Sequence, residues 1–321
     1  MANLDLKDRK ILYELDTNSR QSFNEIAKKV ELSKDSIIYR INKLKEEGII
    51  KQFHTVIDVG KLGYISFRLY LKLQNTTPQK EEEIIEYLKK QKIVTWLVSI
   101  DGEYDLGMAV YVKTIKEMNE LWKDLTKKYV NYIDKKWLAI FTKVSYFPRA
   151  YLLDKKQNFD EYIFVTEPES IDLDQKEIEL VRLLATDSRI SVLDLSQKLK
   201  LTPKTISTKI KELEEKKVIV GYRTMFDLEK LGYQYFKLHI NLHNTTDEKI
   251  KLFRNYVRSH PNIIYDNEVL GGDDLEIEIQ ATTLQEFREI IEDIKKRFSE
   301  MIKDYRHMTF FKEHKFLFFP I

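Results

Sequence analysis

The sequence predicts an α+β protein made of two copies of one unit, each a winged helix-turn-helix followed by a βαββαβ ferredoxin-like domain. Three observations lead to this fold class. A helix-turn-helix pattern lies near the N-terminus and returns 169 residues later. After each copy, the spacing of apolar residues changes from the helical period of about 3.6 to the strand period of 2. The strands and helices that follow alternate in the ferredoxin-like order.

The repeat is a duplication of a long segment without gaps. Leu4–Thr77 aligns with Leu173–Thr246, and 27 of these 74 positions are identical. Unrelated chains of average composition share on the order of 1 position in 15. The two halves therefore arose by tandem duplication, and we expect them to share one architecture.

The first winged helix-turn-helix should contain three helices. The first is expected over Asp5–Thr17, and the second over Phe23–Val30, where a Ser-x-x-Glu capping box opens it. The third follows the N-cap candidate Ser33 and ends near Gly48, a residue suited to the positive φ of a helix stop. Its apolar residues recur at helical spacing and predict one buried stripe: Ile37, Ile41 and Leu44.

An extended segment, Lys51–Val59, follows the third helix and is expected to be the wing. It ends in the turn Lys61–Tyr64, which recurs letter for letter as Lys230–Tyr233. The βαββαβ pattern then follows at 67–73, 79–90, 93–100, 105–112, 116–129 and 137–147. Both helices of such a unit lie on one face of its sheet, so the other face is expected to pack against a second sheet.

The second half repeats these elements. Its helices start at Leu173, Ser191 and Pro203, its wing starts at Val218, and its sheet uses 235–242, 263–270, 275–282 and about 305–319. The predicted domains are a winged helix-turn-helix at 1–62, a ferredoxin-like domain at 63–148, a junction at 149–170, a second winged helix-turn-helix at 171–231 and a second ferredoxin-like domain at 232–321.

The composition is that of a core-forming intracellular protein. Hydrophobic residues make up 43% of the 321 positions, and 54 basic residues nearly balance 52 acidic ones, so any affinity for nucleic acid must come from local patches. The chain has no cysteine, which excludes disulfides and thiolate metal sites. It has no apolar run of the roughly 18 residues that a membrane span needs and no secretory signal. We therefore expect a soluble, cytoplasmic protein that does not contact membranes.

Several separated motifs, taken together, resemble the Lrp/AsnC family of archaeal and bacterial transcription regulators. They are Leu4-Asp5 through Ile11-Leu12, Asn18-Ser19-Arg20, the helix pair, and Gly102-Glu103-Tyr104-Asp105-Leu106. The resemblance covers nearly the whole chain, as two tandem copies where most members carry one. It implies DNA binding by the winged helices, and dimerisation with small-molecule sensing, often of amino acids, by the ferredoxin-like (RAM) domains.

Within each helix-turn-helix, residues on the polar face of the third helix are the candidates for contact with double-stranded DNA. Residues near the N-terminus of such a helix usually reach base edges, which singles out Ser36 and Tyr39, and Thr205 and Thr208. The basic candidates for phosphate contacts are Lys34, Arg40, Lys43, Lys204, Lys209 and Lys211. Ser33 and Thr202 complete the candidate set as N-caps. The alternative is a solvated helix face without a nucleic-acid partner.

The family resemblance also implies an effector site near the turn between two strands. Carried over residue by residue, it points to Gly102, Tyr104 and Asp105, with Gly271 and Asp274 in the second copy. There, Asp273 replaces the tyrosine, so we expect any effector to prefer the first copy. The alternative is structural, since glycine and aspartate are common in tight turns.

No cofactor, metal or catalytic site is predicted. His239 and His243 lie four residues apart on one strand, or about 13 Å, too far to share one metal. The acidic residues form no recognisable acid/base pair, so we expect a protein that is not an enzyme.

Two other functions fit the same architecture. A fused sirohaem decarboxylase would share the winged-helix and βαββαβ units, but it would need histidines and basic residues around a tetrapyrrole pocket, and the first copy has only His54. An architectural, sequence-tolerant DNA-binding protein would fit the weak basic patches.

A last expectation concerns assembly. The two sheets should pack face to face within one chain, as an intramolecular pseudo-dimer, because the tether raises the local concentration of the sister sheet to about the millimolar range. By analogy with the family, we expect further association into homo-oligomers, although the pairing of the halves does not require it. The two winged helices would then read half-sites about one or more DNA turns apart.

Overall fold

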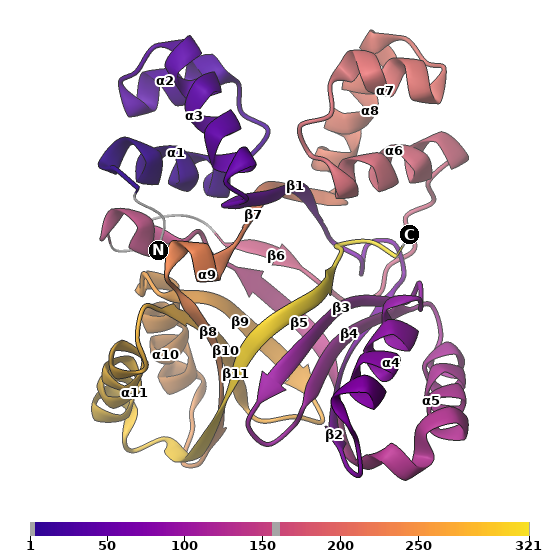
Figure 1. The fold of residues 1–321 in the computed structure, drawn as a ribbon, viewed down its shortest axis with the longest axis vertical. Coiled ribbons are helices and arrows are strands. Elements are labelled where there is room, and N and C mark those ends of the chain that lie inside the picture. Colours follow the sequence, from indigo (N-terminus) through magenta and orange to yellow (C-terminus); the bar gives the residue numbers. More distant parts are fainter. Residues whose placement is uncertain (1–3, 156–160, 321) are drawn as a thin grey trace.

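The computed structural model describes residues 4–155 and 161–320. Two helical heads stand side by side above a single β-barrel, and two pairs of helices flank the barrel (Figure 1). The α+β class with a helix-turn-helix in each half is confirmed. Residues 156–160, within the predicted junction, lie outside the described residues.

Each head contains the three helices that the sequence predicts. The first head has α1 (Leu6–Thr17), α2 (Phe23–Val30) and α3 (Lys34–Glu46), and the second has α6 (Gln175–Thr186), α7 (Val192–Leu199) and α8 (Pro203–Glu215). Every one begins at an Asp, Ser or Thr whose side chain accepts a backbone N–H of the first turn: Asp5, Ser22, Ser33, Asp174, Ser191 and Thr202.

The segments expected to be wings are strands, but they do not form separate hairpins. They are β1 (Ile50–Ile57) and β7 (Ile219–Phe226), which pair with each other in antiparallel fashion. The physical reason is that each strand alone would leave its backbone hydrogen-bonding groups unpaired, whereas the duplicated chain supplies an equivalent strand alongside. The two-stranded ribbon joins the heads to each other and to the barrel below (Figure 1).

Eight strands close into the barrel. In spatial order they are β2 (Ile65–Leu73), β4 (Leu106–Val112), β3 (Val94–Asp101), β11 (Ile302–Phe316), β8 (Gln234–Leu242), β10 (Leu275–Ala281), β9 (Ile263–Leu270) and β5 (Ile133–Tyr146), which pairs back with β2. A short strand, β6 (Tyr162–Phe164), adds to β5 from within the predicted junction.

The face-to-face sandwich of two open sheets was the wrong expectation for how the halves meet. Each half supplies four neighbouring strands in equivalent order, β5-β2-β4-β3 and β11-β8-β10-β9. The two sets join edge to edge, through β3–β11 and β5–β9. Edge pairing satisfies the backbone groups of all four edge strands, and closure removes the edges altogether. The faces away from the helices then line one shared interior.

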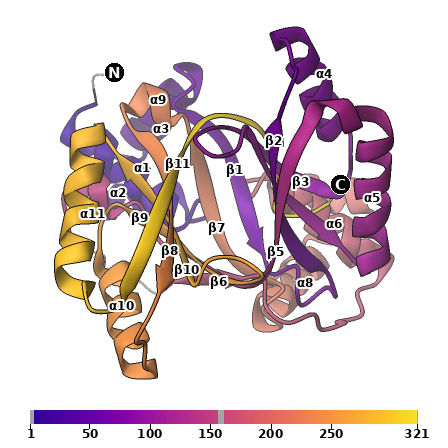
Figure 2. The same cartoon turned by 90° about the horizontal axis from the view of Figure 1, so that it is seen from below.

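Four long helices cover the outside of the barrel in two pairs (Figures 1 and 2). They are α4 (Pro78–Lys89) and α5 (Ile115–Tyr129) on the first half, and α10 (Asp247–Ser259) and α11 (Leu284–Phe298) on the second. Each pair buries an apolar core against its own four strands. The shorter elements are α9 (Leu228–Leu231) and the 3-10 turns η1 (Val130–Tyr132) and η2 (Ala150–Leu153).

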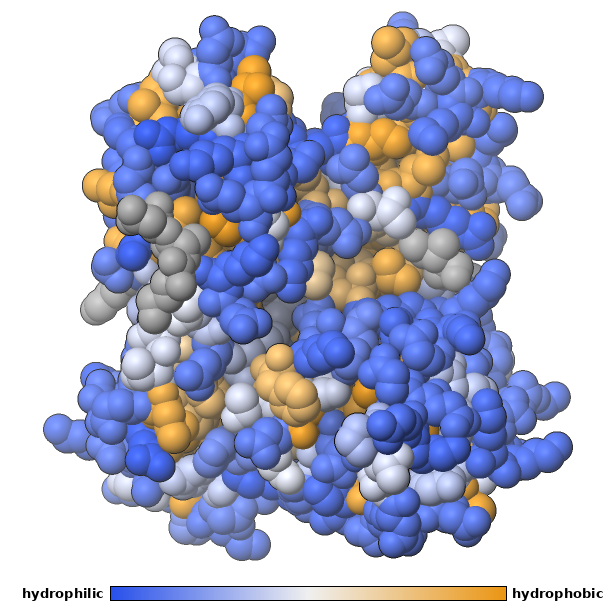
Figure 3. Space-filling model, in the orientation of Figure 1, coloured by the Kyte–Doolittle hydropathy of each residue, from blue (hydrophilic) through white to orange (hydrophobic). Residues whose placement is uncertain are grey.

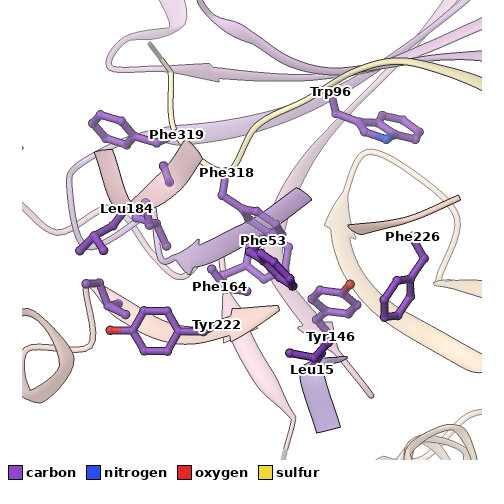
Figure 4. Packing of buried hydrophobic residues seen from close by; sticks show 14 of the residues in the cluster. Leu15, Phe53, Trp96, Tyr146, Phe164, Leu184, Tyr222, Phe226, Phe318 and Phe319 are labelled. Carbon is purple, nitrogen blue, oxygen red and sulfur yellow. The ribbon is translucent and has the colours of Figure 1, made fainter. Parts of the chain in front are cut away.

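The heads are exchanged relative to the barrel halves. The first head stands above α10 and α11 of the second half, and the second head stands above α4 and α5 of the first (Figure 1). A third apolar core fills the space between the heads, the β1–β7 ribbon and the upper end of the barrel; Phe53, Tyr146, Phe164 and Phe318 meet there (Figure 4). In the described part of the chain, no helix is both long and apolar enough to cross a bilayer.

Candidate nucleic-acid interface and barrel interior

The third helix of each head presents its polar side to solvent. In α3, Lys34, Tyr39 and Lys43 are exposed, and 69% of the Tyr39 surface is accessible, which is unusual for so large a ring. In α8, Thr208 is the counterpart of Tyr39 and is exposed as well. Lys204 and Lys211, each one position from the counterpart of Lys34 or Lys43, are also exposed. Figure 3 shows the two heads as separate lobes with mainly hydrophilic surfaces on the visible face.

Four of the predicted DNA-contacting residues already serve the helix starts. The Ser33 hydroxyl accepts the backbone N–H of Ser36, and the two hydroxyls lie 2.8 Å apart. Thr202 and Thr205 repeat this arrangement in the second head, also at 2.8 Å. These hydroxyls fix where each helix begins, and they remain at its exposed N-terminal end.

Two of the predicted phosphate contacts are paired within their own heads. Arg40 Nη1 lies 2.8 Å from an Asp5 carboxylate oxygen and 2.7 Å from one of Asp8. In the second head, Lys209 Nζ lies 2.9 Å from Asp174 and 3.4 Å from Glu177. These pairs join the third helix to the start of the first. Lys34, Lys43, Lys204 and Lys211 are the exposed cations of the set, and of these Lys43 and Lys211 make long surface ion pairs with Glu47 at 3.8 Å and Glu215 at 3.6 Å.

The two recognition helices differ in charge. Helix α3 has four basic and two acidic residues, whereas α8 has three of each, because Glu212, Glu214 and Glu215 crowd its C-terminal end. The helix stops also differ: Gly48 and its counterpart Lys217 both adopt positive φ, of 69° and 58°. Lysine rarely adopts this conformation, so the second head keeps the turn geometry without the residue that suits it.

The heads contact each other across the duplication axis. Ser19 Oγ and Ser188 Oγ lie 2.6 Å apart. Arg20 Nη1 donates to the Ser188 and Ile190 carbonyl oxygens, at 2.5 and 3.2 Å. In the opposite direction, Arg189 Nη1 donates to the Ser19 and Gln21 carbonyl oxygens, at 2.5 and 3.1 Å. These reciprocal bonds fix the distance and angle between the two recognition helices.

A buried ion-pair cluster anchors the first head to the barrel. The Asp16 carboxylate is fully buried and receives Arg149 at 2.6 Å and Arg223 at 2.8 Å. Arg149 Nε also donates to Gln280 of β10. Two guanidinium groups therefore share one carboxylate at the base of the head.

The predicted effector turns are held to the neighbouring strands by their aspartates. Asp105 accepts the Leu73 amide at 2.6 Å and Lys72 Nζ at 2.7 Å. Asp274 accepts the equivalent amide, that of Leu242, at 2.7 Å. Both aspartates thus have a structural role in the turn.

The rest of each turn differs between the halves. Gly102 has a φ of 146° and Gly271 a φ of 81°. Tyr104 is buried and stacks on Tyr70, with ring centroids 5.5 Å apart. Its counterpart Asp273 instead receives the His239 ring at 2.7 Å and Arg306 at 2.7 Å.

The barrel interior holds an ionic network that the sequence patterns above do not predict. Lys237 Nζ lies 2.7 Å from Glu276 and 3.2 Å from Glu278, and all three side chains are buried. Glu278 also accepts from the Tyr235 hydroxyl and from Asn267 Nδ2. The sequence signal was the alternation of β10, where Leu275, Ile277 and Ile279 face the helices and the glutamates between them must face inward.

One group of side chains has the spacing of metal ligands. His239, Asp273 and Glu276 each offer one ligand atom within 4.8 Å of the others, and all three are buried. Arg306 already pairs with Asp273, and Lys237 with Glu276. The group is therefore charge-balanced as it stands, and His243 lies apart from it on the exposed end of the strand.

A family model described as winged helix-turn-helix DNA-binding matches residues 4–51 and 173–220, the two heads. The HTH-type transcriptional regulator Ptr1 of Methanocaldococcus jannaschii is 36% identical over 128 residues, which are 39% of this chain and 81% of that protein. An uncharacterised HTH-type transcriptional regulator of Pyrococcus furiosus is 34% identical over 123 residues, 38% of this chain and 81% of that protein.

Among solved structures, the sirohaem decarboxylase NirDL matches 98% of this chain and 94% of its own, with a TM-score of 0.64 and 15% identity. Its complex with an iron-uroporphyrin III analogue matches equally well, at a TM-score of 0.64 and 14% identity. At this low identity the likeness concerns the fold alone, that is, two helical heads above one barrel.

Proposed function

The chain belongs to the family of winged helix-turn-helix, HTH-type transcriptional regulators, and from this membership we propose that it is a sequence-specific, Lrp/AsnC-type regulator that acts in the cytoplasm without a catalytic role. The observation that carries the proposal is the presence of two helix-turn-helix heads in one chain, fixed to each other by reciprocal bonds. In this proposal, each four-stranded run with its two helices is a RAM-type ferredoxin-like unit.

In this mechanism, α3 and α8 enter the major groove at two half-sites about one or more DNA turns apart. Lys34, Lys43, Lys204 and Lys211 contact phosphates. Tyr39 on α3 stands where α8 has Thr208, and Ser36 where it has Thr205, so the two heads read different bases. The operator is therefore an imperfect palindrome.

Enrichment sequencing of random duplexes at two salt concentrations tests the proposal. We expect a bipartite motif with two unequal halves and an affinity that falls as salt rises. Equal affinity for all duplexes would identify an architectural DNA-binding protein instead.

The proposed effector is a small molecule such as an amino acid, bound at the first turn by Gly102, Tyr104 and Asp105. Support comes from the family resemblance and from the difference between the two turns. An effector's ammonium group would have to replace Lys72 on the Asp105 carboxylate. In the second half, the position of Lys72 is held by Asn241, which bonds to Asp304, so the two sites would not respond alike.

The sirohaem decarboxylase alternative has one observation in its favour, the whole-chain likeness to NirDL. A cleft of about 480 Å³ between the β1–β7 ribbon and the barrel is lined mainly by β7, α9, β8 and β11, and its basic residues are Lys51 and Lys312. A smaller pocket that shares part of this lining adds His54 and Arg149. Titration with iron-uroporphyrin III, followed by its visible absorption, separates the two functions. A regulator leaves the spectrum unchanged, whereas a saturable band shift would support the enzyme.

A further inference from the structure

A small cavity lies inside the barrel, at the end that faces the heads. Its volume is about 60 Å³, and all eight barrel strands contribute to its wall. The polar part of the wall consists of Ser66, Arg68, Tyr235, Asn267 and Glu278. The roof is apolar and is supplied by β5, β6 and the C-terminal segment: Val144, Phe164, Val165, Leu317 and Phe318.

Arg68 is the unusual member of this wall. Only 7% of its surface is exposed, and its guanidinium carbon lies 4.2 Å from the centre of the Trp96 ring and 4.8 Å from that of Phe141. Within the described residues, its Nε and Nη1 have no hydrogen-bond partner, and neither does Ser66 Oγ. Nη2 is 3.6 Å from Glu278, beyond ordinary hydrogen-bond length. A buried cation with free donors is costly unless something accepts from it.

The other charges around the cavity already have partners. Glu278 accepts from Tyr235, Lys237 and Asn267, and Lys237 also pairs with Glu276. Above the roof, Arg149 and Arg223 share the single carboxylate of Asp16. Counted together, Arg68, Lys237, Arg149 and Arg223 carry four positive charges, and the buried carboxylates of Asp16, Asp58, Glu276 and Glu278 carry four negative ones. The need for an acceptor therefore lies with Arg68 itself, whose nearest carboxylate, Glu278, stays 3.6 Å from Nη2.

We propose that the cavity binds a small monocarboxylate of two or three carbon atoms. Its carboxylate accepts from the Arg68 guanidinium and the Ser66 hydroxyl, the geometry for which a planar guanidinium is suited. Its alkyl end lies against the apolar roof, with Phe164 and Phe318. The size follows from the volume: at about 10–15 Å³ for each water-sized position, 60 Å³ holds four to six such positions, as many as acetate or propionate has non-hydrogen atoms.

The roof gives such a ligand a route to the heads. Phe318 stacks on His54 of the β1–β7 ribbon with ring centroids 4.8 Å apart, and Phe316 meets the same ring edge-on at 5.4 Å. The site is separate from the turns at Asp105 and Asp274, and the carboxylate proposed here does not rest on the DNA-binding function proposed for the heads.

Isothermal titration calorimetry of the full chain tests the proposal, with sodium acetate and propionate as probes and sodium chloride keeping the ionic strength constant. We expect saturable binding of one carboxylate per chain, no binding of neutral acetamide, and none of hexanoate, which is too long for the cavity. Equal binding of hexanoate would overturn the proposed site. Competition by chloride as strong as that of acetate would reduce the site to one for an adventitious anion only.

Two variants locate the site. Ser66→Ala removes one neutral donor and should weaken acetate binding roughly 2- to 12-fold, and Arg68→Lys, which loses the planar pair of donors, should weaken it roughly 10- to 100-fold. Ser99→Ala is the matched control, because Ser99 is a buried strand serine that bonds to His314 at 2.8 Å and does not line the cavity. Unchanged affinity in Ser66→Ala refutes the assignment even if Arg68→Lys fails to fold.

Discussion

The hydroxyl oxygens of Ser19 and Ser188 lie 2.6 Å apart, and the two residues are separated by 169 positions, the offset of the duplication. Each serine therefore meets its own duplicate, which places the pseudo-twofold axis of the heads between them. Arg20 and Arg189 surround this contact with reciprocal bonds to carbonyl oxygens of the opposite head.

The first prediction concerns the rigidity of this contact. The double variant Arg20→Ala/Arg189→Ala should lower the free energy of unfolding. Hydrogen bonds to charged groups contribute about 1.5–3 kcal/mol, and because both arginines are partly exposed we expect a loss at the lower end of this range for each. The variant should also bind duplexes whose half-site spacing differs from the optimum nearly as well as the optimal one, because the heads can then separate. A spacing series in a binding assay measures this, and retained preference for a single spacing would contradict it.

Separate cations are expected to serve DNA binding and head stability. Lys34→Ala and Lys204→Ala should each reduce the slope of log K against log salt by about 0.9, the loss of one phosphate contact. Arg40→Ala and Lys209→Ala should change the slope less and should lower the melting temperature of the heads, because their charges are already paired with the acids that cap α1 and α6. If all four variants change the slope equally, Arg40 and Lys209 are phosphate contacts too.

The two turn aspartates should separate a structural role from a ligand-binding one. Asp105→Ala and Asp274→Ala should both destabilise the protein, since each removes an acceptor of a backbone amide. Only Asp105→Ala should abolish the rise in melting temperature caused by an amino-acid effector, found by screening the twenty amino acids. Loss of the rise in both variants would show that the turns respond alike.

His54 should make the protein less stable in acid. Burial holds the pKa of His54 well below its ordinary value of 6.5, and its ring nitrogens have no hydrogen-bond partner among the described residues. Because the folded pKa is the lower one, its contribution to stability is constant above about pH 6.5. Below that pH the unfolded chain takes up a proton that the folded chain refuses, so up to about 1.4 kcal/mol is lost per pH unit.

His54→Phe should remove this part of the pH dependence while keeping the stacking on Phe318. Urea unfolding at pH 5 and pH 7 measures the difference. His243→Asn, at an exposed position, is the control and should leave the slope as it is. An unchanged slope in His54→Phe would mean that the folded protein protonates His54 after all.

Separating the halves tests the closed barrel. Fragments 1–167 and 168–321 should form a one-to-one complex when mixed, because each supplies the edges that the other lacks. Fragment 1–167 alone should self-associate poorly, since Arg68 would then lack the carboxylates of β10. Sedimentation of each fragment and of the mixture measures this, and two monomers that ignore each other would contradict the edge pairing.

The heads could be predicted from the sequence because their signals are local. The caps Ser33 and Thr202, the apolar stripes and the helix stops lie within a few turns of one another, so the positions of all six helices followed from them. The phosphate role of Arg40 and Lys209 rested on helix position alone. The acids that pair with them lie about 32 to 35 residues upstream. Because these acids occur at equivalent positions in both copies, the repeat itself could have indicated the two ion pairs.

The barrel could not be predicted in the same way. Its seams pair β3 with β11 and β5 with β9, strands that lie far apart in the chain, and a face-to-face sandwich would bury the same apolar residues. The ionic interior could in part have been found. Glu276 and Glu278 alternate with apolar residues on a strand expected to be buried on both sides, a pattern that calls for cations opposite.

Fusion frees the barrel interior from the constraint of symmetry. In a homodimer both subunits have the same sequence. A buried cation and the acid that pairs with it are therefore both present in each subunit. Here Arg68 and Lys237 occupy duplicated positions, while the acids nearest to them, Glu276 and Glu278, stand where the first half has Gly107 and Ala109. The two glutamates thus come from one half only, and the fused chain keeps this asymmetry because its two halves are always made together in one polypeptide.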